Sequence, residues 1–136
     1  MKTKLKINIM LLMLAMAAVM GGCQKSPING DLDGQWQVMQ VEPTPPMVFD
    51  HRMYYCISLH VCQLSMYDEG VLATGNLNYS GDTLKLDFRD FGTDHTDDLL
   101  RQFGINENPV VFKVEFPDKN KLILRSGDTV VTLRRF

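Results

Sequence analysis

The stretch LDGQWQVMQVE, residues 32–42, decides the fold class of this chain because its side chains alternate with the period of a β-strand. In an extended strand, Trp36, Val38 and Gln40 fall on one face, and Met39 with Val41 fall on the other. PTPP follows at residues 43–46, and proline ends a strand because it lacks the backbone N–H that sheet pairing needs. The stretch therefore predicts a strand with a sharp end.

The same alternation returns along the rest of the chain, at residues 47–67, 71–79, 83–88, 110–116, 121–125 and 129–136. Short turn sequences separate these segments, for example Ser80-Gly81-Asp82 and Ser126-Gly127-Asp128. We expect seven or eight strands, depending on whether residues 52–67 form one bent strand or two. One short helix is expected near residues 95–103, with Gly104 as the residue that ends it.

These elements predict an all-β fold in which an antiparallel up-and-down meander closes into a barrel of about eight strands. Closure is favoured because it removes the exposed edges that an open meander would leave. The predicted barrel domain spans residues 32–136, after a polar tether over residues 23–31.

Residues 1–22 have the composition of an export signal. Lys2, Lys4 and Lys6 precede an uncharged apolar run over residues 7–20, which is short for a permanent membrane span. Met20-Gly21-Gly22-Cys23 then resembles the cleavage motif of a bacterial lipoprotein signal peptide. That resemblance implies removal of residues 1–22 and acylation of Cys23. We therefore expect a membrane partner and a location in the bacterial cell envelope, on the outer membrane, with its side left open.

Gly34 and Trp36 resemble the Gly-x-Trp motif on the first strand of lipocalins. In that family an arginine near the end of the barrel packs over the indole, and Arg134 or Arg135 is placed to do so. The segments LDGQWQVMQVE, RMYYCISLHVCQL, YSGDTLKLDF, LLRQFGI and LILRSGDTVVTLRRF resemble short lipocalin-like lipoproteins of Bacteroides-type bacteria. The resemblance implies a lipocalin-like barrel, and it says little about activity.

Cys56 and Cys62 raise the question of a metal site or a disulfide. On one straight strand they would lie about 20 Å apart, so a zinc ion could not join them, with or without His60. A tight reversal at residues 58–60 would bring the two sulfurs together in an oxidising compartment. The alternative is a pair of reduced, packed thiols, and the sequence leaves this open.

Other sequence features give no metal, cofactor or catalytic site. The acidic residues of the helix region have irregular spacing for calcium (Asp87, Asp90, Asp94, Asp97 and Asp98), and the histidines are scattered (His51, His60 and His95). No nucleophile or phosphate-binding motif is present. Loss of residues 1–22 moves the net charge from −2 to about −5, so a nucleic-acid partner is not expected.

The expected function is the binding of a small apolar ligand by a non-enzymatic, membrane-anchored barrel. Aromatic residues of the strands are the candidate pocket lining: Tyr54, Tyr79, Phe88, Phe112 and Phe116. The alternative is a structural or interaction protein with a barrel filled by side chains, accessory to a cell-envelope complex. An eight-stranded barrel is narrow enough for either outcome.

Overall fold

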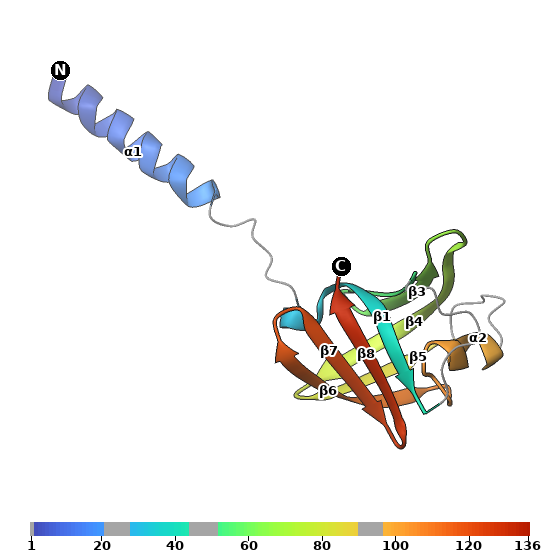
Figure 1. Ribbon diagram of the computed structural model, residues 1–136. Coiled ribbons are helices and arrows are strands. Elements are labelled where there is room, and N and C mark those ends of the chain that lie inside the picture. Colours follow the sequence, from blue (N-terminus) through green and yellow to red (C-terminus); the bar gives the residue numbers. More distant parts are fainter. Residues whose placement is uncertain (1, 21–27, 44–51, 90–96) are drawn as a thin grey trace.

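The computed structural model describes residues 2–20, 28–43, 52–89 and 97–136, with side chains described outside residues 14–20. It confirms the predicted fold: eight antiparallel strands follow one another around a closed barrel, and the last pairs with the first (Figure 1). The strands are β1 (Gly34–Glu42), β2 (Met53–Ser58), β3 (Val61–Met66), β4 (Gly70–Ser80), β5 (Thr83–Asp87), β6 (Val110–Asp118), β7 (Lys121–Ser126) and β8 (Thr129–Arg135).

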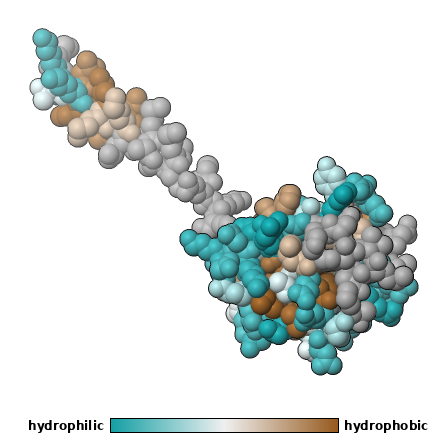
Figure 2. All heavy atoms as spheres, in the orientation of Figure 1, coloured by the Kyte–Doolittle hydropathy of each residue, from teal (hydrophilic) through white to brown (hydrophobic). Residues whose placement is uncertain are grey.

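Three helical segments accompany the barrel. α1 (Lys2–Met20) precedes it, η1 (Gly30–Leu32) leads into β1, and α2 (Asp97–Gln102) lies between β5 and β6. The described side chains of α1 are exposed, and Figure 2 shows them hydrophilic at the tip and hydrophobic behind it. Within the described residues, no helix is long and apolar enough to cross a membrane.

Residues 52–67 form two strands, which answers the question left open by the sequence. β2 and β3 form a hairpin in which Ser58 pairs with Val61 and Leu59-His60 make the turn. Leu59 adopts a left-handed backbone conformation, with φ of 55°. Glycine or asparagine usually occupies such a position, which is why the residue types did not reveal the turn.

A β-bulge in β1 changes which of its side chains face inward. The pairing with β8 shifts between Val38 and Gln40, so that Val41 lies opposite Val131. Val41 is therefore buried in the core with Trp36 and Val38, rather than on the opposite face as strict alternation predicted. Gln40 is correspondingly exposed. An extra residue in one strand reverses the facing of everything after it.

The inside of the barrel is filled by side chains. Phe88 shows how closely they pack, because an added Cβ on Gly75 would lie 2.7 Å from its ring. The inward residues that have no accessible surface are Trp36, Val38, Tyr55, Cys62, Leu64, Ala73, Leu84, Leu86, Phe88, Phe112, Leu122, Leu124, Val131 and Leu133. A void of ligand size would leave accessible area on the side chains around it, and these have none.

The segment after α2 packs over one end of the barrel. The hydroxyl of Tyr55 donates a hydrogen bond to the carbonyl of Phe103, and the two rings lie 5.9 Å apart. Gly104 has φ of +80°, and a Cβ there would lie 2.3 Å from Val131. The segment can approach β8 this closely only because residue 104 is a glycine. We call this the helix end of the barrel.

Candidate functional site

The opposite end, which we call the closed end, is built around Trp36. Its indole N–H donates a 2.9 Å hydrogen bond to the carbonyl of Leu32 in η1. The guanidinium of Arg135 lies 4.3 Å from the centre of the indole ring system, in cation–π geometry. Trp36 and Arg135 are register partners on β1 and β8, so their side chains share the inner face.

The structure thus assigns different places to the two candidate arginines. Arg135 covers the indole, whereas Arg134 points outward and donates a 2.9 Å hydrogen bond to Gln37. Gly34 has φ of +140°, and a Cβ on it would lie 3.0 Å from the Arg135 guanidinium. The glycine of the Gly-x-Trp motif is therefore required by its backbone conformation and by the arginine beside it.

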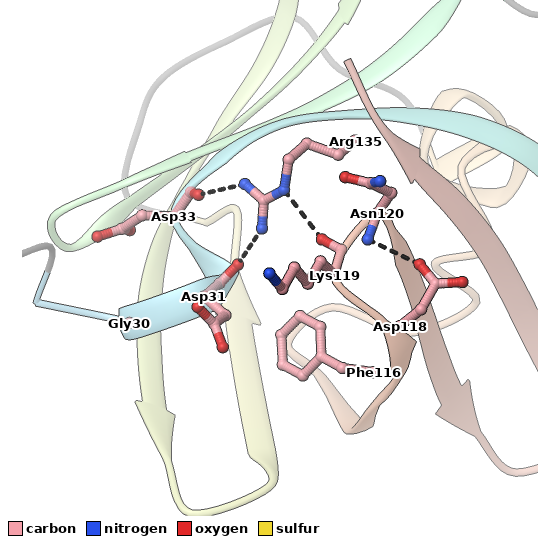
Figure 3. A pocket seen from close by; sticks show the side chains of 8 residues that line it. All are labelled: Gly30, Asp31, Asp33, Phe116, Asp118, Lys119, Asn120 and Arg135. Atoms are coloured by element: carbon pink, nitrogen blue, oxygen red, sulfur yellow. Dashed lines mark hydrogen bonds between the residues drawn. The ribbon is translucent and has the colours of Figure 1, made fainter.

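Arg135 also ties three segments together. Its guanidinium donates hydrogen bonds to the backbone carbonyls of Asp31, Asp33 and Lys119, at 2.7, 3.2 and 3.1 Å. A surface cavity of about 660 Å³ surrounds these contacts (Figure 3), lined by Gly30, Asp31, Asp33, Phe116, Asp118, Lys119, Asn120 and Arg135. The guanidinium of Arg135 is thus held by backbone carbonyls. The cavity has a mainly polar lining, with Phe116 as its one aromatic residue.

A second surface cavity, of about 610 Å³, lies beside η1 on the outer side of the barrel. We call it the Leu59 groove. It is lined by Ile28, Asp33, Gly34, Gln35, Cys56, Ile57, Ser58, Leu59, Val61 and Gln63. Ile28 and Leu59 are 53% and 62% exposed. Asp33 is the one acidic or basic residue in this lining, so the groove is mainly apolar and uncharged.

Asn29 holds the two sides of the Leu59 groove in place. Its side-chain amide donates to the carbonyl of Leu59 at 2.8 Å and to the carboxylate of Asp33 at 2.7 Å. The backbone N–H of Asn29 reaches the other carboxylate oxygen of Asp33 at 3.3 Å. Asn29 therefore joins η1 to the β2–β3 turn. Sequence reasoning missed this residue, because nothing in the residues around 29 signals a partner 30 positions away.

The five aromatic residues expected to line one pocket do not come together. Phe88 and Phe112 are core residues without accessible surface. Tyr54 lies outside the inner layer, because its neighbour Tyr55 pairs with Trp36, and its ring meets that of Phe136 edge-on at 5.1 Å. Tyr79 and Phe116 are half-buried and pack against the core. Of the five aromatic residues, Phe116 is the one that lines the 660 Å³ cavity around Arg135.

The two cysteines are free thiols, so the possible disulfide is not formed. The reversal at residues 58–60 does occur, but its register pairs Cys56 with Gln63 and Cys62 with Ile57. Adjacent register pairs face opposite sides of a sheet, so Cys62 is buried inside and Cys56 lies on the outer face. Burial raises the pKa of the Cys62 thiol well above its usual value.

The remaining ionisable candidates are dispersed. His60 lies exposed in the β2–β3 turn, and the described residues contain no group of three or more His, Cys, Asp or Glu able to hold a metal. Hydrogen bonds from Arg89 lower the pKa of Asp87 to about 2, and Arg101 pairs with Asp98 at 2.8 Å. The predicted acylation site Cys23 lies outside the described residues. So do four residues for which no metal or catalytic role is predicted: His51, Asp90, Asp94 and His95.

Comparison with known proteins agrees with this geometry. The family model of a lipocalin-like domain matches residues 16–136. The crystal structure of a lipocalin-like protein from Bacteroides uniformis aligns with a TM-score of 0.61 and 24% identity, covering 79% of this chain and 100% of that one. An uncharacterized protein from Bacteroides eggerthii aligns with a TM-score of 0.56 and 14% identity, covering 76% of this chain and 98% of that one.

No curated protein matches the chain. The family model nevertheless covers the whole barrel, including the Gly34 and Trp36 of β1 and the Arg135 that closes it. The chain belongs to the lipocalin-like domain family.

Proposed function

We propose that this protein is an exported bacterial lipoprotein, anchored through an acylated Cys23, whose barrel is a non-enzymatic binding module with a filled interior. The observation that carries the filled interior is the absence of accessible surface on the inward side chains, among them Trp36, Tyr55, Phe88 and Phe112. The anchor rests on the resemblance of residues 20–23 to a lipoprotein signal. Binding then takes place on the outside of the barrel. This favours the interaction protein of the cell envelope over a carrier that encloses an apolar ligand.

An enclosed ligand would have to displace packed side chains. Removing a large aromatic side chain from a core costs about 3–5 kcal/mol, so a ligand would need to recover that much before it gained any affinity. At the helix end, Tyr55 and Phe103 are joined by a buried hydrogen bond, and Gly104 fits directly against Val131. The packing thus opposes entry from this end as well.

Two charged groups of the closed end, those of Arg135 and Asp33, serve the fold. Arg135 is engaged by three backbone carbonyls, and both carboxylate oxygens of Asp33 accept hydrogen bonds from Asn29. Catalysis requires groups free to exchange protons with, or attack, a substrate. We therefore assign no catalytic role to Arg135 or Asp33.

Native mass spectrometry of the acylated protein, released from membranes in mild detergent, tests the filled interior. We expect the mass of the acylated chain alone, and no saturable change in Trp36 fluorescence with a fluorescent fatty acid. The Phe88→Ala variant is the positive control, since an apolar cavity in a core takes up small hydrocarbons such as benzene. A small apolar ligand retained at one molecule per wild-type chain, together with a saturable change in Trp36 fluorescence, would overturn the filled interior.

Replacement of the acylated residue tests the anchor separately. The Cys23→Ser variant should leave the membrane fraction and lose the mass of the acyl groups. Cys56→Ser is the matched control, because Cys56 is a free thiol on the outer face of the barrel and should leave partition unchanged. Equal membrane partition of both variants would refute the anchor.

A further inference from the structure

We infer that the Leu59 groove rests against the lipid surface that carries the anchor, so that the barrel is held in one orientation on the membrane. This inference depends on the acylated Cys23 of the proposed function. It adds a second point of membrane contact, made by the folded barrel itself through the apolar side chains of Ile28 and Leu59.

The distance along the chain is the first argument. Ile28 is five residues after Cys23, and a chain of that length spans at most about 17 Å when fully extended. An acylated Cys23 would therefore keep the Leu59 groove within one short tether of the lipid headgroups. Short flexible tethers give millimolar effective concentrations, so even a weak apolar contact at this place would be occupied.

The charge distribution of the barrel is the second argument. Glu42 is the sole charged residue of β1 to β4, and it lies at the end of β1 remote from Gly34 and the groove. The other half of the barrel carries its charges along every strand: Lys85, Asp87, Lys113, Glu115, Asp118, Lys121, Arg125, Arg134 and Arg135. A charged side chain is costly to remove from water, so the β1–β4 half is the one suited to lie against lipid.

The construction of the Leu59 groove is the third argument. Asn29 bonds to the Leu59 carbonyl and to both oxygens of the Asp33 carboxylate. These bonds satisfy the single charge in the groove and join Ile28, the neighbour of Asn29, to the β2–β3 turn. The exposed side chains of Ile28 and Leu59 thus lie on segments that the Asn29 hydrogen bonds hold together. Apolar side chains inserted at the boundary of headgroups and acyl chains stabilise such contacts.

Quenching by brominated lipid tests the inference. The acylated full-length mature protein is placed in phosphatidylcholine vesicles with brominated or ordinary acyl chains, and tryptophan fluorescence is compared. In the Leu59→Trp variant we expect quenching several-fold greater than in the Val71→Trp variant. Val71 is the matched control, since it is 54% exposed and is the second residue of β4, at the end of the barrel away from Leu59. The buried Trp36 gives the background to subtract.

A charge in the groove provides the second measurement. Adding Leu59→Asp to an Ile28→Trp reporter should reduce its quenching several-fold while vesicle flotation stays complete. Both positions are exposed, and circular dichroism checks that the barrel remains folded. Flotation with equal quenching of the Leu59→Trp and Val71→Trp variants would overturn the groove contact alone. Loss of flotation in the wild-type protein would overturn the anchor.

A second copy of the chain is the competing occupant. Sedimentation of the Cys23→Ser variant at rising concentration should show a monomer throughout. A dimer that disappears in the Leu59→Asp background would assign the groove to self-association and overturn the membrane contact.

Discussion

Replacement of Arg135 by alanine should destabilise the barrel far more than replacement of its neighbour Arg134. Arg135 lies 4.3 Å over the indole of Trp36, a contact worth about 1 kcal/mol where the groups are partly shielded from water. It also donates to three backbone carbonyls, and about 0.5 kcal/mol each remains after competition from water. The expected loss is about 2–3 kcal/mol.

Arg134 provides the matched control, since it is the same residue type on the same strand. Its guanidinium makes a 2.9 Å hydrogen bond to Gln37 on the outer side of the barrel. Exposed substitutions of this kind change stability by about 0.5 kcal/mol or less. The Arg134→Ala variant should therefore unfold close to the wild-type protein.

Urea unfolding followed by Trp36 fluorescence measures both losses, because Trp36 is the sole tryptophan of the chain and is buried beneath Arg135. With a urea dependence of about 1.5 kcal/mol per molar, the Arg135→Ala midpoint should fall by roughly 1.3–2 M. Equal midpoints for the two variants would refute the assignment of Arg135 as the residue that closes the barrel. A larger effect at Arg134 would refute it as well.

Three further predictions follow from single contacts. Gly104→Ala should cost about 2–4 kcal/mol in the same urea assay, because the residue has φ of +80° and its Cβ would overlap β8. In the native protein a thiol reagent should label Cys56, while Cys62 reacts only on unfolding, since burial raises its pKa. The lowered pKa of Asp87 means that its stabilising effect is complete above about pH 4 and is lost as the pH falls through about 2; an NMR titration of Arg89→Gln should move that pKa upward.

Much of the fold could be predicted from alternation and turn chemistry. The hairpins around Gly81 and Gly127 follow from glycine in the turn, and both residues have the positive φ that such turns require. The β2–β3 turn could not be predicted in the same way, because Leu59 takes a left-handed conformation without the residue type that favours it. The bulge between Val38 and Gln40 was equally hidden, since it depends on the pairing with β8.

The closed end could be predicted in part. Gly34 and Trp36 are separated by one residue in the sequence, so their motif can be recognised there. The choice between Arg134 and Arg135 depends on the register of β8 against β1. The prediction that the five aromatic residues line one pocket was wrong for a related reason. Alternation shows that a ring faces inward, and it does not show whether another side chain already occupies the space. Phe88 against Gly75 is such a case, since the bare glycine backbone leaves room for the ring itself.

A filled barrel changes where specificity can reside. In a barrel with a cavity, inward side chains select the ligand; here they are committed to packing, and substitutions among them act on stability first. The outer residues are not committed to core packing. One of them, Leu59, departs from the residue types that are usual for its backbone conformation. Leu59 has a left-handed backbone conformation, which is unfavourable for a leucine, and its apolar side chain is 62% exposed. The barrel therefore gains no core packing from this side chain to offset the unfavourable backbone conformation. Glycine would relieve the backbone at that position. The membrane contact that we propose for the Leu59 groove would account for an exposed leucine at that position.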